Sequence, residues 1–145
     1  MKTYNRDDIL ELLPHRDPFL WVDRIDIIKR GEEGIGYKEI TADMDFFRGH
    51  FPGNPVMPGV LQIEAMAQTA GCVVSESLKD SPEQLSQVYF MSIDKVKFRQ
   101  IVTPGVTLKM HAQKVKSHGK VYVFAAKAYV DDKLVSEASF TAIVS

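Results

Sequence analysis

The chain has 145 residues, 45% of them apolar and 26% charged, which are the proportions of an ordinary soluble globular protein. This length suits a single compact domain covering residues 1–145 and leaves little room for a second. The formal net charge of −1 gives no attraction to nucleic acid or to an anionic membrane, so we expect neither a nucleic-acid partner nor membrane insertion.

The first part of the chain predicts one short helix and two strands. Residues 6–13 suit the helix, which Pro14 prevents from continuing. Residues 19–28 and 34–40 are rich in β-branched and aromatic side chains and predict two strands joined around residues 31–34. Residues 44–59 then combine proline and glycine with aromatic residues, which indicates a shaped loop rather than a regular element.

A long helix is predicted after Pro58, from Val60 to about Leu78. Proline suits the first turn of a helix, where its missing N–H is no loss. Because apolar side chains cover nearly every face of this helix, we expect it to be buried on all sides. Residues 81–83 predict a short connecting turn.

The last third of the chain predicts four strands. They cover residues 88–99, 106–115, 121–130 and 134–144, and short segments with turn chemistry separate them. Connections this short require antiparallel neighbours. The expected fold class is therefore α+β, with a curved antiparallel sheet wrapped around one buried helix.

Two side chains stand out as candidates for acid–base chemistry. Between Gly49 and Ser75, Glu64 is the one formally charged residue and His50 the one histidine. A carboxyl group inside an apolar helix favours its neutral form, as a general acid at neutral pH requires. Histidine is the natural proton acceptor at that pH, and the loop before the helix leaves His50 free to approach it. Taken singly, Glu64 also fits a carboxyl bonded to backbone or water, and His50 a core histidine.

Four stretches of the sequence resemble the hot-dog-fold 3-hydroxyacyl-acyl-carrier-protein dehydratases of the FabZ type. They are Leu-Pro-His-Arg-Asp-Pro-Phe-Leu at residues 13–20 with Val-Asp-Arg at 22–24, Phe-Arg-Gly-His-Phe-Pro-Gly-Asn-Pro-Val-Met-Pro-Gly-Val at 47–60, Glu-Ala-Met-Ala-Gln at 64–68, and Val-Tyr-Phe-Met-Ser-Ile-Asp-Lys-Val-Lys-Phe-Arg at 88–99. The resemblance covers essentially the whole chain. It implies a long central helix wrapped by a curved antiparallel sheet.

The resemblance also implies an activity and its residues. The enzyme would be a lyase that removes water from a 3-hydroxyacyl thioester on acyl carrier protein, in fatty acid biosynthesis, in lipid A biosynthesis or in both. The catalytic histidine of the family falls on His50 and the catalytic glutamate on Glu64, and in the family these two come from opposite subunits of a dimer. The amide N–H of Gly59 matches the oxyanion donor, with Phe51 and Val60 as further substrate-binding positions. The implied assembly is a homodimer, commonly three dimers in a hexamer, and no metal or organic cofactor is required.

Other residues have a functional and an ordinary interpretation. Ile63, Phe46 and Met57 suit either an acyl tunnel or the core, and Tyr89 suits either a tunnel gate or a strand tyrosine with a bonded hydroxyl. A strand alternates its side chains, so Lys95, Lys97 and Arg99 are expected on one face, either solvated or docking the acidic carrier protein. His15 and Arg16 belong to the resembling motif and are expected to be structural.

Three alternatives to a simple dehydratase remain. A hot-dog acyl-CoA thioesterase shares the fold, but the pair of His50 and Glu64 with Gly59 between them argues against it. A dehydratase–isomerase of the same kind usually carries aspartate where Glu64 stands. A non-catalytic acyl-binding regulator needs an added DNA-binding domain, for which the chain leaves no room.

The cysteine content and the first residues suggest where the protein works. Cys72 is the one cysteine, so no disulfide within the chain is possible, and we expect it to act as a small buried hydrophobic side chain. The first eight residues lack the apolar stretch of a secretory signal. A protein of the reducing cytoplasm is therefore expected.

Overall fold

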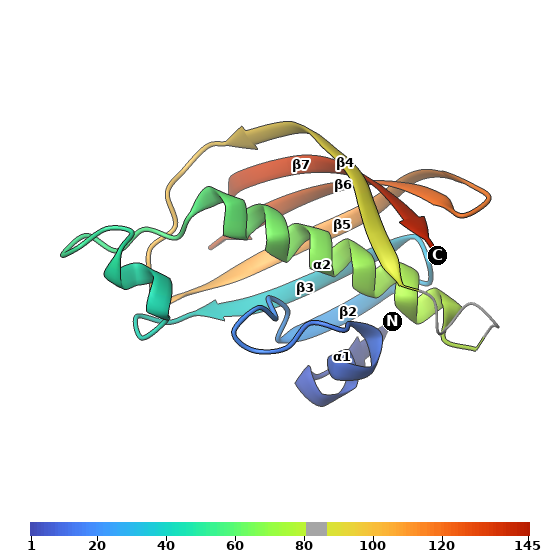
Figure 1. Cartoon of the computed structure of the whole chain (residues 1–145), viewed down its shortest axis with the longest axis horizontal. Helices are drawn as coiled ribbons and strands as arrows, with labels where there is room; N and C mark the ends of the chain where they lie inside the picture. Colours follow the sequence, from blue (N-terminus) through green and yellow to red (C-terminus); the bar gives the residue numbers. More distant parts are fainter. Residues whose placement is uncertain (81–86) are drawn as a thin grey trace.

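A computed structural model describes residues 1–80 and 87–145. A seven-stranded antiparallel sheet curves around one long helix, α2 (Figure 1). The strand order is β1-β2-β3-β5-β6-β7-β4. The elements are β1 (Lys2–Tyr4), α1 (Arg6–Leu12), β2 (Arg24–Lys29), β3 (Glu33–Ile40), the 3-10 turn η1 (Asp45–Arg48), α2 (Gly59–Leu78), β4 (Val88–Phe98), β5 (Val106–His118), β6 (Val121–Val130) and β7 (Lys133–Val144). This confirms the predicted α+β fold class.

The predicted elements differ from the observed ones mainly near the amino terminus. The three-residue strand β1 was not predicted, and the strand expected from residue 19 begins only at Arg24. The backbone of residues 19–21 bonds instead to a side chain of α2, since Phe19 O accepts from Gln68 Nε2 and Trp21 N–H donates to Gln68 Oε1. The turn expected at residues 81–83 lies outside the described residues.

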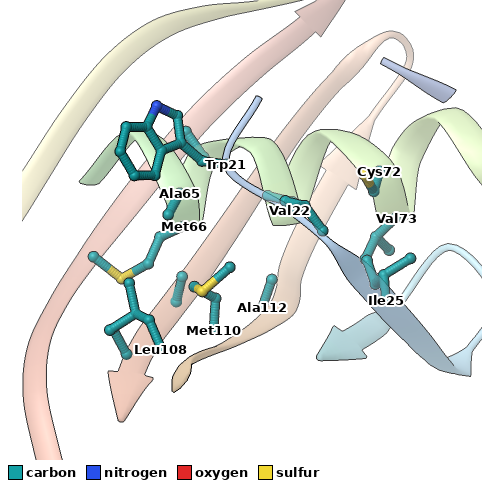
Figure 2. Packing of buried hydrophobic residues seen from close by; sticks show 14 of the residues in the cluster. Trp21, Val22, Ile25, Ala65, Met66, Cys72, Val73, Leu108, Met110 and Ala112 are labelled. Carbon is teal, nitrogen blue, oxygen red and sulfur yellow. The ribbon is translucent and has the colours of Figure 1, made fainter. Parts of the chain in front are cut away.

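Helix α2 is buried along its central part, as its composition predicts. Residues 65–74 are all buried, whereas Val60 near the amino end is 70% exposed. Figure 2 shows Met66 of α2 near Leu108 and Met110 of β5, within the same buried cluster. Among the described residues, no helix combines the length and apolar character needed to cross a membrane.

Cys72 lies fully buried in the same cluster, beside Val73 (Figure 2). Burial raises the pKa of its thiol, because a thiolate loses its hydration there. The prediction of a buried hydrophobic cysteine is therefore confirmed, and its sulfur is not a candidate nucleophile.

Two glycines of β3 let α2 lie directly on the sheet. A Cβ atom at Gly34 would stand 2.6 Å from Cγ2 of Val73, and one at Gly36 would stand 2.5 Å from Oγ1 of Thr69. Thr69 is fully buried, and its hydroxyl donates to the carbonyl of Ala65 at 2.9 Å. Neither helix residue has free space to retreat into, so glycine at these two positions sets how closely helix and sheet approach.

Gly36→Ala is expected to lower the free energy of unfolding by about 1–3 kcal/mol, because the added methyl group overpacks this contact. Urea unfolding followed by circular dichroism measures the change. Gly49→Ala is the matched control, since a Cβ there meets nothing within 4 Å and the residue has φ −108°. Equal stability of the two variants would show that the helix does not depend on Gly36 for its approach.

Candidate active site

His50 lies in the loop between η1 and α2, and its ring is oriented by the loop backbone. His50 Nδ1 is 2.7 Å from the carbonyl oxygen of Val56, and the amide of Val56 donates back to the carbonyl of His50. A carbonyl oxygen only accepts, so Nδ1 carries the ring proton. Nε2 is then the nitrogen with a free lone pair, which is the form that a general base needs.

The amino end of α2 faces the same hollow as His50. This His50 hollow is lined by His50, Val56, Met57, Gly59, Val60, Gln62, Phe98, Arg99, Gln100 and Ile101. Gly59 is the first residue of the helix, and Pro58 before it provides no side-chain cap. The first N–H groups of a helix have no partner within it and lie at its positive end, so they favour an anionic oxygen. A Cβ at Gly59 would stand 2.6 Å from the ring of Phe98, so the ring can lie against the helix here only because residue 59 is glycine.

Glu64 is held by Gln68, one helical turn further along α2. Gln68 Nε2 donates to Glu64 Oε2 at 2.7 Å and also to Phe19 O at 2.9 Å, while Gln68 Oε1 accepts from Trp21 N–H at 2.7 Å. Gln68 is 2% exposed, so these bonds are shielded from water. Sequence reasoning gave Gln68 no role, although its spacing of four residues from Glu64 places both side chains on one face of a helix.

The Glu64 side chain is 30% exposed in the single chain, so the expected burial of this carboxyl group is only partly met. His15 lies on its open side, with Nε2 3.7 Å from Glu64 Oε2. His15 and Gln68 belong to a second hollow, the His15 hollow, lined by residues 10–16, Ala67, Gln68, Gly71, Ser75, Gln87, Val88 and Phe90.

Within one chain, Glu64 does not line the His50 hollow, although Val60, four residues earlier on α2, does. Glu64 follows Gly59 by five residues, which turns it about 140° around the helix from Gly59 and moves it ~7.5 Å along the axis. Neither the His50 hollow nor the His15 hollow is lined by both side chains. Each hollow instead reaches β4, the His50 hollow at Phe98 and the His15 hollow at Val88 and Phe90.

Comparison with known proteins identifies the family of this chain. The family model described as "FabA-like domain" matches residues 13–139. The chain belongs to the FabA-like family. A 3-hydroxyacyl-acyl-carrier-protein dehydratase FabZ from Granulibacter bethesdensis is 49% identical, covering 94% of this chain and 79% of its own. One from Syntrophotalea carbinolica is 46% identical, covering 94% of this chain and 91% of its own.

Solved structures confirm the hot-dog fold of this FabA-like chain. The dehydratase heterocomplex ApeI:P from Xenorhabdus doucetiae superposes with a TM-score of 0.78. It covers 94% of this chain and 90% of its own, at 16% identity. At that identity, the likeness supports the fold alone.

Some of the remaining predicted substrate-binding residues lie at the His50 hollow and others lie elsewhere. Phe51 stacks on the ring of His50, with centroids 4.1 Å apart, and Met57 and Val60 line the His50 hollow. Phe46 packs between Trp21 and Phe47, away from both hollows, and Ile63 packs against the core. Tyr89 is 53% exposed on β4, and its hydroxyl donates to Gln87 Oε1 at 3.2 Å.

The expectation that Lys95, Lys97 and Arg99 share one face of a regular strand is wrong. Asp94 pairs with Ser139 and Lys97 with Glu137, so β4 advances three residues where β7 advances two. An extra residue of this kind interrupts the alternation of side chains. Lys95 accordingly has φ +54°. Arg99 lies beyond the end of β4, and its Nε donates to Glu137 at 2.8 Å.

Glu137 neutralises part of this positive surface. The bond from Arg99 holds the pKa of the Glu137 carboxyl below its usual range, with smaller effects from Lys127 and Lys97. For metal ions, no group of three or more histidine, cysteine or acidic residues within residues 1–80 and 87–145 has the arrangement of a binding site.

Proposed function

We propose that this chain is a 3-hydroxyacyl-acyl-carrier-protein dehydratase, a hydro-lyase of fatty acid biosynthesis that forms a trans-2-enoyl thioester. The observation that carries the proposal is the orientation of His50, whose Nδ1–H is committed to the carbonyl of Val56 and whose Nε2 is left as a base. Glu64, held by Gln68, supplies the complementary acid. FabZ relatives that are 46–49% identical over nearly the whole chain support the substrate class.

The proposed reaction moves two protons. His50 Nε2 takes the proton from C2 of the acyl chain, and the electron pair of that C–H bond forms the double bond between C2 and C3. The bond from C3 to the hydroxyl oxygen breaks as Glu64 protonates that oxygen, and water leaves. Negative charge grows on the thioester oxygen meanwhile, and the N–H groups of Gly59 and Val60 at the positive end of α2 suit that oxygen.

We further propose that a complete site needs two copies of the chain, joined through β4. This strand lies at the edge of the sheet, and Tyr89, Met91, Ile93 and Phe98 expose 47–60% of their surfaces along it. An open edge with apolar side chains favours pairing with another strand. If two copies of β4 pair antiparallel about their middle, the Phe98 end of one lies beside the Val88 end of the other. The His50 hollow of one chain then meets the His15 hollow of the second.

We also propose a hexameric assembly, a docking surface for the carrier protein and a gate for the acyl tunnel. Three such dimers forming a hexamer follow from the resemblance stated above. Lys95 and Lys97 lie on β4, close to the proposed junction of the hollows, and are proposed to attract the acidic carrier protein. Arg99 contributes less to this attraction than the sequence suggests because it already pairs with Glu137. Tyr89 is proposed to gate the acyl tunnel.

Ile93→Lys is expected to convert the protein from a dimer or hexamer into folded monomers without dehydratase activity, because a charge in the middle of the β4 edge opposes pairing. Sedimentation velocity measures the assembly state, and circular dichroism checks the fold. Val115→Lys is the matched control, since Val115 is 62% exposed on β5, a strand with neighbours on both sides. An active Ile93→Lys monomer would refute assembly through β4.

The activity itself is tested by incubating the protein with a 3-hydroxyacyl-acyl-carrier-protein and identifying the products by mass spectrometry and chromatography. Loss of one water to give the trans-2-enoyl thioester is the expected result. Formation of the cis-3 isomer as well would identify a dehydratase–isomerase. Release of free fatty acid would identify a thioesterase, and binding without turnover would identify an acyl-binding module.

A further inference from the structure

We propose that His15 is a positioning residue of the active site, which fixes the oxygen of Glu64 that delivers its proton to the substrate. This inference rests on the proposed dehydratase function. The sequence suggested only a structural role for His15, and the structure places its Nε2 3.7 Å from Glu64 Oε2. Catalytic contacts are often long in the absence of substrate and shorten in the reacting complex, so a small rotation of either side chain makes this a hydrogen bond.

The backbone around His15 is anchored on both sides. The guanidinium group of Arg16 donates to the carbonyls of Leu10, Leu13 and His15 at 2.7–3.0 Å. Further along, Gln68 bonds Phe19 O and Trp21 N–H. The segment that carries His15 is therefore tied to the same glutamine that holds Glu64, and these bonds fix the backbone from which the imidazole reaches the carboxyl group.

The surroundings of the ring select one tautomer. His15 Nδ1 is buried and has no hydrogen-bond partner among the described residues. A buried N–H without an acceptor is rarer and costlier than a buried acceptor without a donor. The proton of the neutral ring therefore belongs on Nε2, which faces Glu64.

Glu64 Oε2 accepts a hydrogen bond from Gln68 Nε2 at 2.7 Å, and the His15 Nε2 that faces the same oxygen stands 3.7 Å away. In the proposed reacting complex both N–H groups donate to Oε2, which makes this oxygen the poorer place for the carboxyl proton. The transferable proton consequently lies on Oε1, for which no partner is recorded among the described residues. Of the other ionisable groups in the His15 hollow, Arg16 directs its charge to backbone carbonyls and Glu11 is exposed, so His15 is the ionisable side chain recorded against Glu64.

The kinetic test compares His15→Phe with His15→Gln in the full-length protein. Phenylalanine keeps a ring but removes the N–H, and we expect kcat to fall about tenfold with KM unchanged, since the substrate itself has lost no contact. Glutamine places an amide N–H near the position of the imidazole Nε2, and we expect kcat within about twofold of wild type. Unchanged kcat in His15→Phe, or an equal loss in both folded variants, would overturn the proposal.

Nitrogen-15 NMR of the histidine rings tests the tautomer in the wild-type protein and needs only the His15→Gln variant to be folded. The chain has four histidines, and the signal missing in His15→Gln assigns the ring. Protonation on Nε2 at neutral pH is expected, whereas protonation on Nδ1 or on both nitrogens would contradict the proposal. A wild-type protein without dehydratase activity would refute the proposed function instead, so the two failures are distinguishable.

Discussion

His50→Ala is expected to lower kcat for dehydration by about a thousandfold, because no other base replaces Nε2 and general acid–base catalysis contributes roughly 10²–10⁴. Glu64→Gln is expected to cause a loss of similar size, since the amide keeps the shape of the side chain and the bond to Gln68 but has no acidic proton to give. Steady-state formation of the trans-2-enoyl thioester measures both. KM should change little, because neither substitution removes surface from the acyl tunnel.

His118→Ala is the matched control for the His50 variant, since His118 is exposed at the end of β5. Circular dichroism and sedimentation must give wild-type results for both catalytic variants before their rates are compared. A Glu64→Gln protein that keeps more than about a tenth of the wild-type kcat would remove Glu64 from the role of general acid. In the same way, a His50→Ala protein that keeps more than about a tenth of the wild-type kcat would remove His50 from the role of general base.

Mixing the two inactive variants is expected to restore activity. If each site takes His50 from one chain and Glu64 from the other, a mixed dimer contains one site with both residues intact and one with neither. Random exchange of subunits makes about half of the dimers mixed, and each of these has one working site of two, so the mixture should reach about a quarter of the wild-type rate. Activity measured before and after exchange in mild denaturant tests this expectation.

The mixing experiment separates two structural explanations. If His50 and Glu64 met within one chain through a loop movement, every chain in the mixture would lack one of them and the rate would stay at background. Exchange itself is followed by tagging one variant and detecting the other on the affinity resin. Verified exchange without restored activity would rule out sites shared between subunits.

Much of the fold could be predicted because local signals and tertiary packing agree. Pro58 and the apolar run after it predict α2 almost to the residue, and turn residues separate β5, β6 and β7 at nearly the predicted bounds. Residues 19–23 were predicted as strand because their side chains favour one. The backbone of Phe19 and Trp21 bonds instead to Gln68, 49 and 47 residues away in the sequence, which no local pattern can indicate.

In the candidate site, too, local sequence signals identify some features, whereas features that depend on backbone contacts or strand register are missed. His50 and Glu64 stand out in the sequence because each is alone in an apolar stretch. The carbonyl of Val56, which sets the tautomer of His50, belongs to the backbone and leaves no mark in the sequence. The sequence predicts wrongly that Lys95 and Lys97 share one face, because side chains alternate between faces only in a regular strand. The extra residue in β4 depends on its register with β7, which the local sequence does not indicate.

The two glycines of β3 also determine where the proposed catalytic residues of α2 lie. Gly34 and Gly36 receive Val73 and Thr69 of α2, so they fix the helix along its own axis. Gly59 and Glu64 belong to that same helix, so the proposed oxyanion donor and the proposed acid move together. Gly34 and Gly36 thus set the position of the proposed catalytic residues on α2 relative to the sheet. Relatives with bulkier residues at these two positions should hold the acyl group at a different depth.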